Sequence, residues 1–245
     1  HVKMNASASA MSLTANADFI ADVGATTFDL SDDTNTTGTN VINLAALTSN
    51  TAVTIIGSAG VDTITAEDGG ITTVTGGGGA DTIALSGTGA ADVINYETVA
   101  ELGAVDAGDT ITTLTAGTDT FTLSNAFATT GLETAIGFTS VTFATNQAIT
   151  LTALTTAAGT DREGYAVEFT GSTIGDTLAN LIDGAIASGA AAGAGFVLID
   201  NGTDGALYYD PDFDVQGTTG DINLVANITG YTDIGTLIGV TLDAA

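Results

Sequence analysis

One short motif recurs along the chain and limits what it can fold into: a glycine, any residue, Asp or Asn, any residue, and then an aliphatic or aromatic residue. Its clear copies are GTNVI at 38–42, GVDTI at 60–64, GADTI at 79–83 and GTDTF at 117–121, and its looser copies are AADVI at 90–94, GDTI at 108–111 and GDTL at 175–178. Glycine allows a tight turn, and the last residue suits a short buried strand. This reuse favours a repeat architecture over a single phosphate-binding loop at 76–84.

The spacing of the motif is that of an imperfect nine-residue repeat. Asp62 and Asp81 are 19 positions apart, and Asp81 and Asp92 are 11 positions apart. The segments GSAGVDTIT at 57–65 and GGGGADTIA at 76–84 follow the frame G-G-x-G-x-D-x-U-x, where U is aliphatic, although the first has serine in place of the second glycine. This frame is the calcium-binding nonapeptide of RTX proteins. The sequence therefore resembles that family, the hemolysin-type calcium-binding repeat proteins exported by type I secretion.

The frame has a physical basis in turn geometry and calcium chemistry. Its glycines let main-chain carbonyl groups converge in a turn, the Asp at the sixth place supplies a carboxylate, and the following aliphatic residue points into the core. Two units make one coil of a parallel β-roll, and calcium between successive turns joins layers that cannot fold alone. The predicted ligands are Asp62, Asp81, Asp92, Asp109 and Asp119, with Gly57, Gly76 and Gly78. The alternative is that Asp and Gly only punctuate turns between strands.

Two later segments extend the resemblance to this family. AGDTITTLTAGTDTFTLSN at 107–125 is similar to the segment that follows the family's repeats. FVLIDNGTDGALYYDPDFD at 196–214 is similar to the family's C-terminal hairpin, in which an LYYD strand runs into an acidic loop. The resemblance covers roughly residues 57–240.

The acidic loop after the LYYD strand is a second candidate calcium site. Its predicted ligands are Asp200, Asp204, Asp210, Asp212, Asp214 and Asp221. The third, fourth and fifth of these have the 1, 3, 5 spacing of an oxygen-ligand calcium loop, and the last stands at the twelfth place, where such a loop closes. Val215 stands where an EF-hand needs glycine, so we expect a calcium clasp on a β-hairpin instead. The alternative is a solvated acidic turn.

The charge of the chain points to cations as partners. It has 29 Asp and Glu residues against two cations, Lys3 and Arg162, and a net charge of -27. A compact fold with this imbalance repels itself unless cations bind to it, and carboxylate and carbonyl oxygens favour calcium. Nucleic acid is excluded because no basic surface is present to neutralise phosphates. Polyanionic polysaccharides and anionic membranes are disfavoured for the same reason.

Catalysis finds little support in the residue types present. The chain has no Cys and one His, His1, which is expected at a mobile terminus. This removes His-based triads and H-E-x-x-H zinc sites. No acidic pair is singled out for glycoside hydrolysis, and Arg162 alone cannot bind a uronate. Tyr208 and Tyr209 are interpreted as strand packing rather than a sugar platform, and we predict that the chain is not an enzyme.

The fold class that follows is all-β. We expect a parallel β-roll or β-helix-like solenoid with calcium-binding turns, then an antiparallel C-terminal part with one short amphipathic helix at about 174–188, where apolar residues recur with helical spacing. The predicted divisions are an N-terminal strand segment at 1–36, which pairs with the roll or with a neighbouring subunit, a degenerate roll at 37–130, and a C-terminal β region with the helix and the clasp at 131–245. No apolar run approaches the length of a membrane span.

These features together favour a structural protein. We expect a calcium-binding protein outside the cell or on its surface, in a Gram-negative bacterium as the resemblance implies, that folds after export and self-assembles into a surface layer, filament or matrix. The partners expected are Ca²⁺, further copies of the chain and, as a further candidate, cell-surface polysaccharide. The alternative is that the chain is the calcium-binding and secretion module of a larger exoenzyme, toxin or adhesin. A third interpretation is an adhesive module that binds a neutral glycan.

Overall fold

The computed structural model of the protein describes most of the first half of the chain and five strand-containing stretches of the rest. The described residues are 1–4, 9–20, 24–48, 50–87, 89–102, 107–115, 118–124, 138–143, 164–169, 195–210, 223–230 and 240–243. Within them the regular structure is almost entirely β, with a short 3-10 turn at Val99–Glu101 and helical backbone at residues 19–20. The expected all-β class is confirmed.

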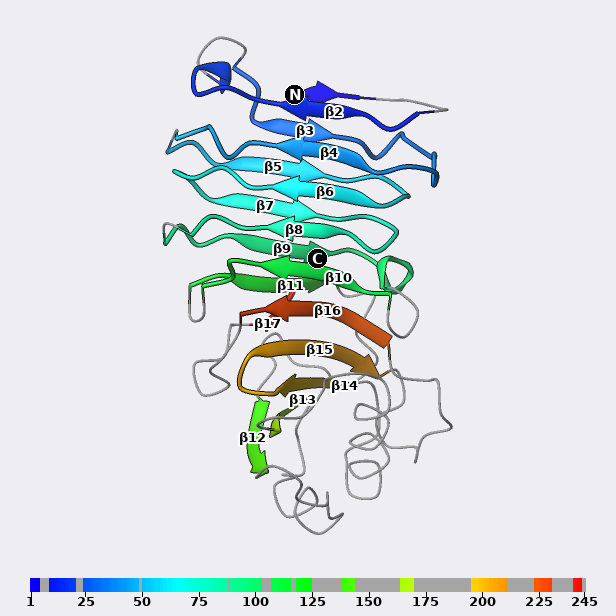
Figure 1. Ribbon diagram of the computed structural model, residues 1–245, viewed down its shortest axis with the longest axis vertical. Coiled ribbons are helices and arrows are strands. Elements are labelled where there is room, and N and C mark those ends of the chain that lie inside the picture. Colours follow the sequence, from blue (N-terminus) through cyan, green and yellow to red (C-terminus); the bar gives the residue numbers. More distant parts are fainter. Residues whose placement is uncertain are drawn as a thin grey trace.

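The strands form two sheets that the chain visits alternately. The first sheet contains, in order, β1 (Val2–Lys3), β3 (Thr27–Asp29), β5 (Val53–Ile56), β7 (Thr72–Thr75), β9 (Val93–Tyr96), β11 (Thr120–Ser124) and β17 (Val240–Asp243). The second contains, in order, β2 (Ser12–Thr14), β4 (Asn40–Asn43), β6 (Asp62–Thr65), β8 (Thr82–Ala84), β10 (Asp109–Thr112), β16 (Asn223–Thr229), β15 (Asp204–Asp210), β14 (Gly195–Asp200), β13 (Gly164–Phe169) and β12 (Phe138–Phe143). From β2 to β11 each coil of the chain therefore gives one strand to each sheet (Figure 1).

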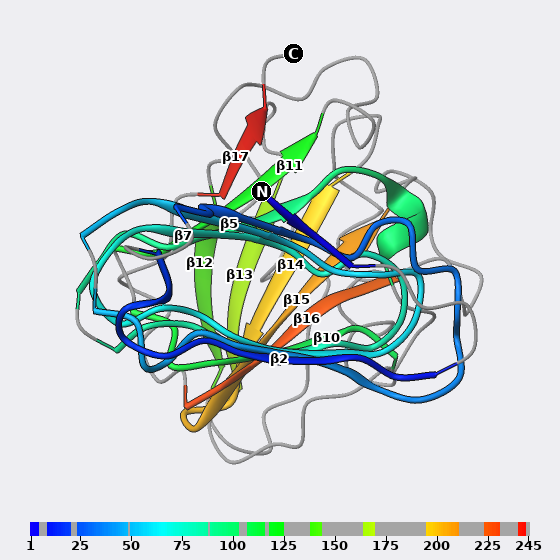
Figure 2. The same ribbon diagram turned by 90° about the horizontal axis from the view of Figure 1, so that it is seen from above.

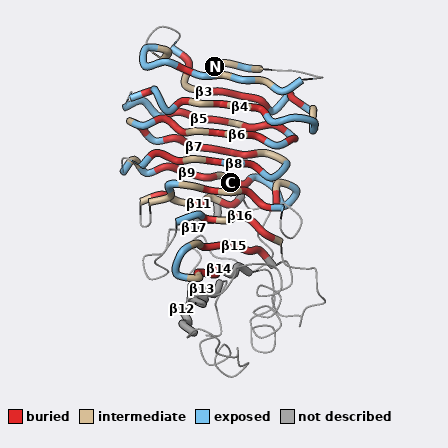
Figure 3. Tube along the Cα trace, viewed as in Figure 1, coloured by how far each residue is buried: buried red, intermediate tan, exposed pale blue. Residues whose placement is uncertain are grey.

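Neighbouring strands of the coiled part are parallel, and equivalent residues of successive motifs lie in register. Ile64 of β6 is paired with Ile42 of β4 and with Ile83 of β8, and Ile83 is paired with Ile111 of β10. The first sheet has a corresponding inner row of Phe28, Ile55, Val74, Ile94 and Phe121. Each residue in both rows exposes at most 1% of its surface. Figure 3 shows this core as buried strands flanked by exposed turns. We call this part of the molecule the coil stack.

The C-terminal strands both close the coil stack and extend it. β16 pairs in parallel with β10, and β17 pairs in parallel with β11, so strands from the end of the sequence lie next to the last coil. β15 is antiparallel to both β14 and β16, which confirms the expected antiparallel pairing near the C-terminus. Viewed from above, the strands from β16 to β12 turn progressively away from the direction of β10 (Figure 2), as the twist of a sheet requires.

The predicted divisions can be compared with these pairings. The strands within 1–36 pair with the coil stack, since β1 lies beside β3, β3 beside β5, and β2 beside β4. The C-terminal region at 131–245 supplies β16 and β17 to the same two sheets. The helix predicted at 174–188 lies outside the described residues. In the part of the chain that is described, no helix has the length and apolar character needed to cross a bilayer.

Candidate metal centre

Three of the predicted aspartates form one column on the second sheet. Asp62 begins β6, Asp81 immediately precedes β8 and Asp109 begins β10. The Asp62 N–H donates to Asp81 Oδ1 at 2.8 Å, and the Asp81 N–H donates to Asp109 Oδ1 at 2.9 Å. All three side chains are buried, with at most 2% exposed. This first aspartate column (Asp62, Asp81 and Asp109) therefore links three successive coils.

The remaining two repeat aspartates form a second column on the first sheet. Asp92 immediately precedes β9, and Asp119 immediately precedes β11. The Thr72 N–H donates to Asp92 Oδ1 at 2.8 Å, and the Asp92 N–H donates to Asp119 Oδ1 at 2.9 Å. Because the strands of the two sheets run in opposite directions (Figure 1), the second aspartate column (Asp92 and Asp119) lies on the opposite side of the coil stack. The structure thus divides the predicted repeat ligands between two places.

The second carboxylate oxygen of most of these residues closes its own turn. Asp62 Oδ2 accepts the Ser58 N–H at 2.6 Å, Asp92 Oδ2 accepts the Ser86 N–H at 3.0 Å, and Asp119 Oδ2 accepts the Thr115 N–H at 2.7 Å. Hydrogen bonds of this kind satisfy main-chain donors in the turns. The turn-punctuating role of aspartate is therefore present in the structure, whatever else these carboxylates bind.

Asp81 differs from the other repeat aspartates in its second carboxylate oxygen. Its Oδ2 is buried and has no hydrogen-bond partner. The nearest groups include Gly76, where a Cβ atom would lie 2.5 Å from Asp81 Oδ2 and 3.2 Å from Asp109 Oδ2. A buried carboxylate oxygen without a partner is costly, so this atom is the strongest indication of a ligand in the column.

The glycines of the frame are required by the close approach of successive turns. A Cβ atom at Gly57 would overlap the carbonyl oxygen of Gly76 in the next coil, and one at Gly77 would overlap the carbonyl oxygen of Ser58. Gly77 and Gly79 also have φ values of 92° and 113°, which disfavour residues with a side chain. The four consecutive glycines therefore fit a turn stacked directly on its neighbour, and Gly78 donates its N–H to the Ser58 carbonyl at 2.9 Å.

Burial and mutual repulsion disfavour the ionised form of the carboxyl groups in the first aspartate column. Burial, with the charge of Asp109 adding to it, raises the pKa of Asp81 to about 9. Burial also raises the pKa of Asp109 to about 6, although its Oδ2 accepts a hydrogen bond from the Tyr96 hydroxyl at 2.9 Å. The pKa of Asp62 is raised for the same main reason. At neutral pH Asp81 therefore carries a proton unless a cation is bound beside it.

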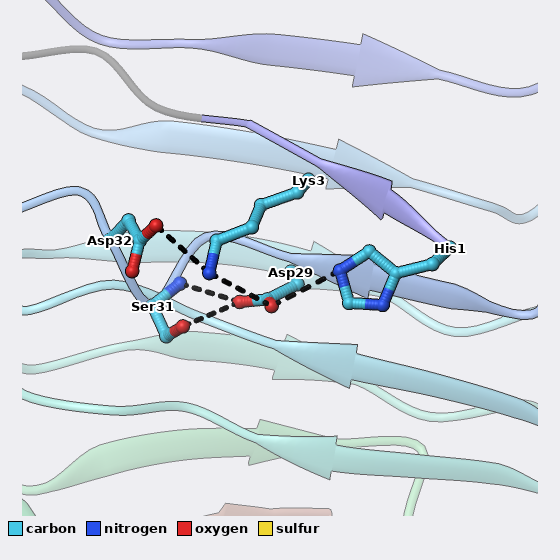
Figure 4. Close-up of polar contacts among 5 residues, drawn as sticks. All are labelled: His1, Lys3, Asp29, Ser31 and Asp32. Atoms are coloured by element: carbon cyan, nitrogen blue, oxygen red, sulfur yellow. Dashed lines mark hydrogen bonds and ion pairs between the residues drawn. The ribbon is translucent and has the colours of Figure 1, made fainter.

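The cationic side chains of the described residues lie elsewhere, at the N-terminal end of the coil stack (Figure 4). Lys3 Nζ is 2.8 Å from Asp32 Oδ2 and 3.8 Å from Asp29 Oδ2, and His1 Nε2 is 3.3 Å from Asp29 Oδ2. The hydroxyl of Ser31 is the largest cause that holds the pKa of Asp29 below its usual value, and Lys3 adds to it. The expected mobile terminus is thus an ion-paired strand, which the residue types alone did not indicate.

The donors in the first column fit a hard cation such as calcium. Carboxylate and main-chain carbonyl oxygens are its usual ligands, and Asp81 Oδ2 is an unpartnered oxygen of this kind. Within the described ranges, however, no three His, Cys, Asp or Glu side chains form a group that could hold a metal. A calcium ion here would therefore need main-chain carbonyl oxygens from the glycine turns as well as the carboxylate.

The second candidate site, the acidic clasp, is only partly within the described residues. Asp200 ends β14 and Asp204 begins β15, with Asp200 Oδ1 accepting the Gly202 N–H at 2.6 Å and Asp204 Oδ1 accepting the Gly230 N–H at 2.8 Å. Asp210 ends β15, six residues from Asp204, or about 20 Å along a strand. The structure therefore does not bring Asp200 and Asp204 next to Asp210. Asp212, Asp214 and Asp221 lie outside the described residues.

Asn40, which was not predicted as a site residue, occupies the equivalent place one coil before the first aspartate column. It is in register with Asp62 and is 3% exposed. Its Oδ1 accepts the Met11 N–H at 2.9 Å, and its Nδ2 donates to Ser58 Oγ at 3.0 Å. The motif GTNVI placed Asn40 at the aspartate position of the repeat, so alignment of the motifs was the signal for this role.

Comparison with known proteins does not assign this chain to a family. No protein-family model matches it, and no match was found among the curated proteins or among the solved structures.

Proposed function

We propose that this chain is an extracellular calcium-binding structural protein that folds and self-assembles when calcium binds its first aspartate column. The observation that carries the proposal is the buried, unpartnered Oδ2 of Asp81, located between two further buried carboxylates of the same column. A bound calcium ion would neutralise these charges and join consecutive turns. The RTX-like nonapeptide frame at 76–84 supports the same ligand.

The residues of the column would act together in metal binding. Asp81 Oδ2 is the free carboxylate oxygen, and Gly76 leaves the space beside it. Asp62 Oδ2 accepts the Ser58 N–H of its own turn, and Asp109 Oδ1 accepts the Asp81 N–H, so both neighbouring turns are held in place. The Tyr96 hydroxyl, which also lies 3.3 Å from the Val225 carbonyl oxygen, connects the column to β16. Ion binding would thus be coupled to the packing of the last coil.

The outer faces of the coil stack support the self-assembly part of the proposal. Thr63, Thr82 and Thr110 are in register across three strands of the second sheet and are partly or fully exposed. Such uncharged faces are where two copies of a chain with a net charge of -27 can approach with least repulsion. Calcium binding would lower the remaining repulsion between copies.

The test separates folding from assembly. Far-ultraviolet circular dichroism and thermal unfolding are measured with chelator and with added Ca²⁺, using Mg²⁺ at the same ionic strength as the control. We expect Ca²⁺ to raise the unfolding temperature, by an amount equivalent to about 2.7 kcal/mol at a concentration 100 times the dissociation constant. An unchanged unfolding curve contradicts calcium-coupled folding.

Assembly is then followed on the same samples. Light scattering should rise with Ca²⁺ and with protein concentration, and negative-stain microscopy should show ordered sheets or filaments. Monodisperse single particles at all concentrations, with folding still dependent on Ca²⁺, would contradict self-assembly and leave the calcium-binding part of the proposal standing.

A further inference from the structure

The turns that follow β6 and β8 lie directly on each other on the side of the second aspartate column. Thr65 is paired with Ala84, so Glu67 and Ser86 occupy equivalent places two residues further along. Thr73 is paired with Val93, so Thr72 and Asp92 are equivalent at the other end of the same turns. Two hydrogen bonds confirm this closeness, because Asp92 accepts the N–H groups of both Thr72 and Ser86. Four polar residues therefore surround one short section of the stack.

This section contains most of the unsatisfied buried polar atoms in the described residues. Four such side-chain atoms are found, and three of them are Glu67 Oε1, Thr72 Oγ1 and Ser86 Oγ. Their residues are 0%, 0% and 4% exposed, respectively. The charge of Asp92 contributes to raising the pKa of Glu67, although burial is the larger cause, so the two carboxylates are near each other. The three residues with unpartnered oxygens are thus all neighbours of Asp92, two through hydrogen bonds of their main-chain N–H groups and Glu67 through its charge.

The turn between β6 and β7 differs from the nonapeptide frame at its first and sixth places. Glu67 stands five positions before Thr72, as Gly57 stands five positions before Asp62. The place of a frame glycine is therefore taken by a carboxylate side chain, and the place of the frame aspartate by a hydroxyl. Such a turn offers a side-chain carboxylate at the first place, where the frame glycine has only its main-chain carbonyl group, and a hydroxyl at the sixth place, where the frame has a carboxylate.

We infer that these turns form a second, separate cation site, in which one hard divalent cation binds Glu67, Thr72 and Ser86 beside Asp92. Two carboxylates and two hydroxyl groups present only oxygen ligands, which suit calcium rather than a softer transition metal. Among the described residues the Lys and His side chains are ion-paired with Asp29 and Asp32, so no cationic side chain is placed to serve instead. The site does not require the first aspartate column to bind calcium.

The test counts calcium ions by isothermal titration calorimetry of the full chain. Glu67→Gln keeps the shape of the side chain and removes its charge, so we expect one ion fewer per chain than in the wild type. Asp68→Asn is the matched control, because it removes a charge from the neighbouring exposed position. It should leave the number of ions unchanged. A Glu67→Gln protein that binds as many ions as the wild type overturns the inference.

Two further variants keep the test independent of folding and of the first column. Thr72→Val has nearly the same shape without the hydroxyl, and it should weaken the affinity of one site by about tenfold or more, as losses near metal ligands do. Unchanged affinity counts against the site. Asp81→Asn should remove a different ion; if it removes none while Glu67→Gln does, the proposed site at Asp81 fails and the second site stands. A wild-type chain that binds no calcium overturns both.

Discussion

The two aspartate columns lie on opposite sides of the same coil stack and differ in what surrounds each carboxylate. In the first column, glycines at 57 and 76 allow the turns to touch, and three buried carboxylates follow one another. In the second, the equivalent turn places hold Glu67 and Ser86, and Thr72 replaces one aspartate. The same ladder of N–H to carboxylate hydrogen bonds runs through both.

This difference separates two properties of the aspartate in the motif: its acceptor oxygen, which links the coils, and its buried negative charge, which is unfavourable. The ladder needs an acceptor oxygen at the sixth place, and Asn40 provides one without a charge. The charge of the carboxylates is not needed for that hydrogen bond, and burial makes it unfavourable. Retained buried charge therefore points to a cation, and the first prediction below tests this at Asp81.

The largest effect is expected from removing the charge of Asp81. Its pKa of about 9 lies above the ordinary carboxyl value near 4, so the metal-free folded chain holds a proton that the unfolded chain releases. The stability of the metal-free protein should therefore fall as pH rises through this window, by at most about 1.4 kcal/mol per pH unit for one proton. Thermal unfolding in chelator should show that Asp81→Asn reduces this slope.

The control for this prediction is Asp68→Asn, which removes an exposed charge and should keep the slope of the wild type. The effect of calcium has the opposite pH dependence, because the ion displaces the proton and its stabilisation grows as pH rises. Equal slopes for Asp81→Asn and the wild type would show that Asp81 does not carry a raised pKa.

The next largest effect is expected from closing the space between turns. Gly57→Ala would place a Cβ atom against the carbonyl oxygen of Gly76, so overpacking should cost about 1–3 kcal/mol of unfolding free energy or more. Gly87, in the second column's turn, has nothing within 4 Å of such an atom. Gly87→Ala should therefore change stability by less than about 0.5 kcal/mol. Urea unfolding of the two variants measures the difference, and equal effects would mean that the turns are not stacked as described.

A smaller effect is expected from Tyr96→Phe, which tests the link between the first column and β16. The variant leaves Asp109 Oδ2 without its hydroxyl donor, and an unsatisfied buried acceptor costs about 1–3 kcal/mol. The aromatic stacking on Phe121, with ring centroids 6.5 Å apart, is retained. Relative to the wild type, amide hydrogen exchange should accelerate more at β16 than at β6. Uniform loss of protection in all strands would contradict a local role.

The smallest effect is expected at the N-terminal strand, away from both columns. Lys3→Met removes an exposed side chain that is ion-paired with Asp32 and Asp29. We expect faster hydrogen exchange at the Met4 N–H, which donates to the Asp29 carbonyl at 2.9 Å, with no measurable change in the global unfolding temperature. A large drop in that temperature would show that this strand nucleates the whole stack.

Much of the coil stack could be predicted from the sequence because its motif indicates both the position of each turn and the strand that follows it. Gly57 and Gly76 mark the turns, and Ile64 and Ile83 are the buried members of their strands, as the spacing predicted. The all-β class follows from that periodicity, and the parallel strands were expected from the resemblance of the repeat to the nonapeptide frame. The strands near the C-terminus were also expected, but their return to the side of β10 and β11 was not, because strand partners distant in sequence leave no local pattern.

The site was predicted less completely than the fold. The aspartates were found from the repeat, yet their division into two columns depends on which sheet each strand joins. The hydrogen bond from the Asp62 N–H to Asp81 joins one coil to the next, so it becomes visible only once the strand register is known. Glu67 was missed because it stands where the frame has glycine, so matching the sequence to the frame did not mark it as a ligand. Calcium, the ligand expected from the sequence, stays a prediction.

The most direct test of the central claim is a crystal structure of the protein grown with calcium, with anomalous scattering used to locate the ions. The account predicts an anomalous peak bonded to Asp81 Oδ2, with main-chain carbonyl oxygens of the glycine turns completing the ligands at about 2.3–2.6 Å. An Asp81 side chain that instead hydrogen-bonds to protein or water, with no peak beside the first aspartate column at saturating calcium, would contradict it.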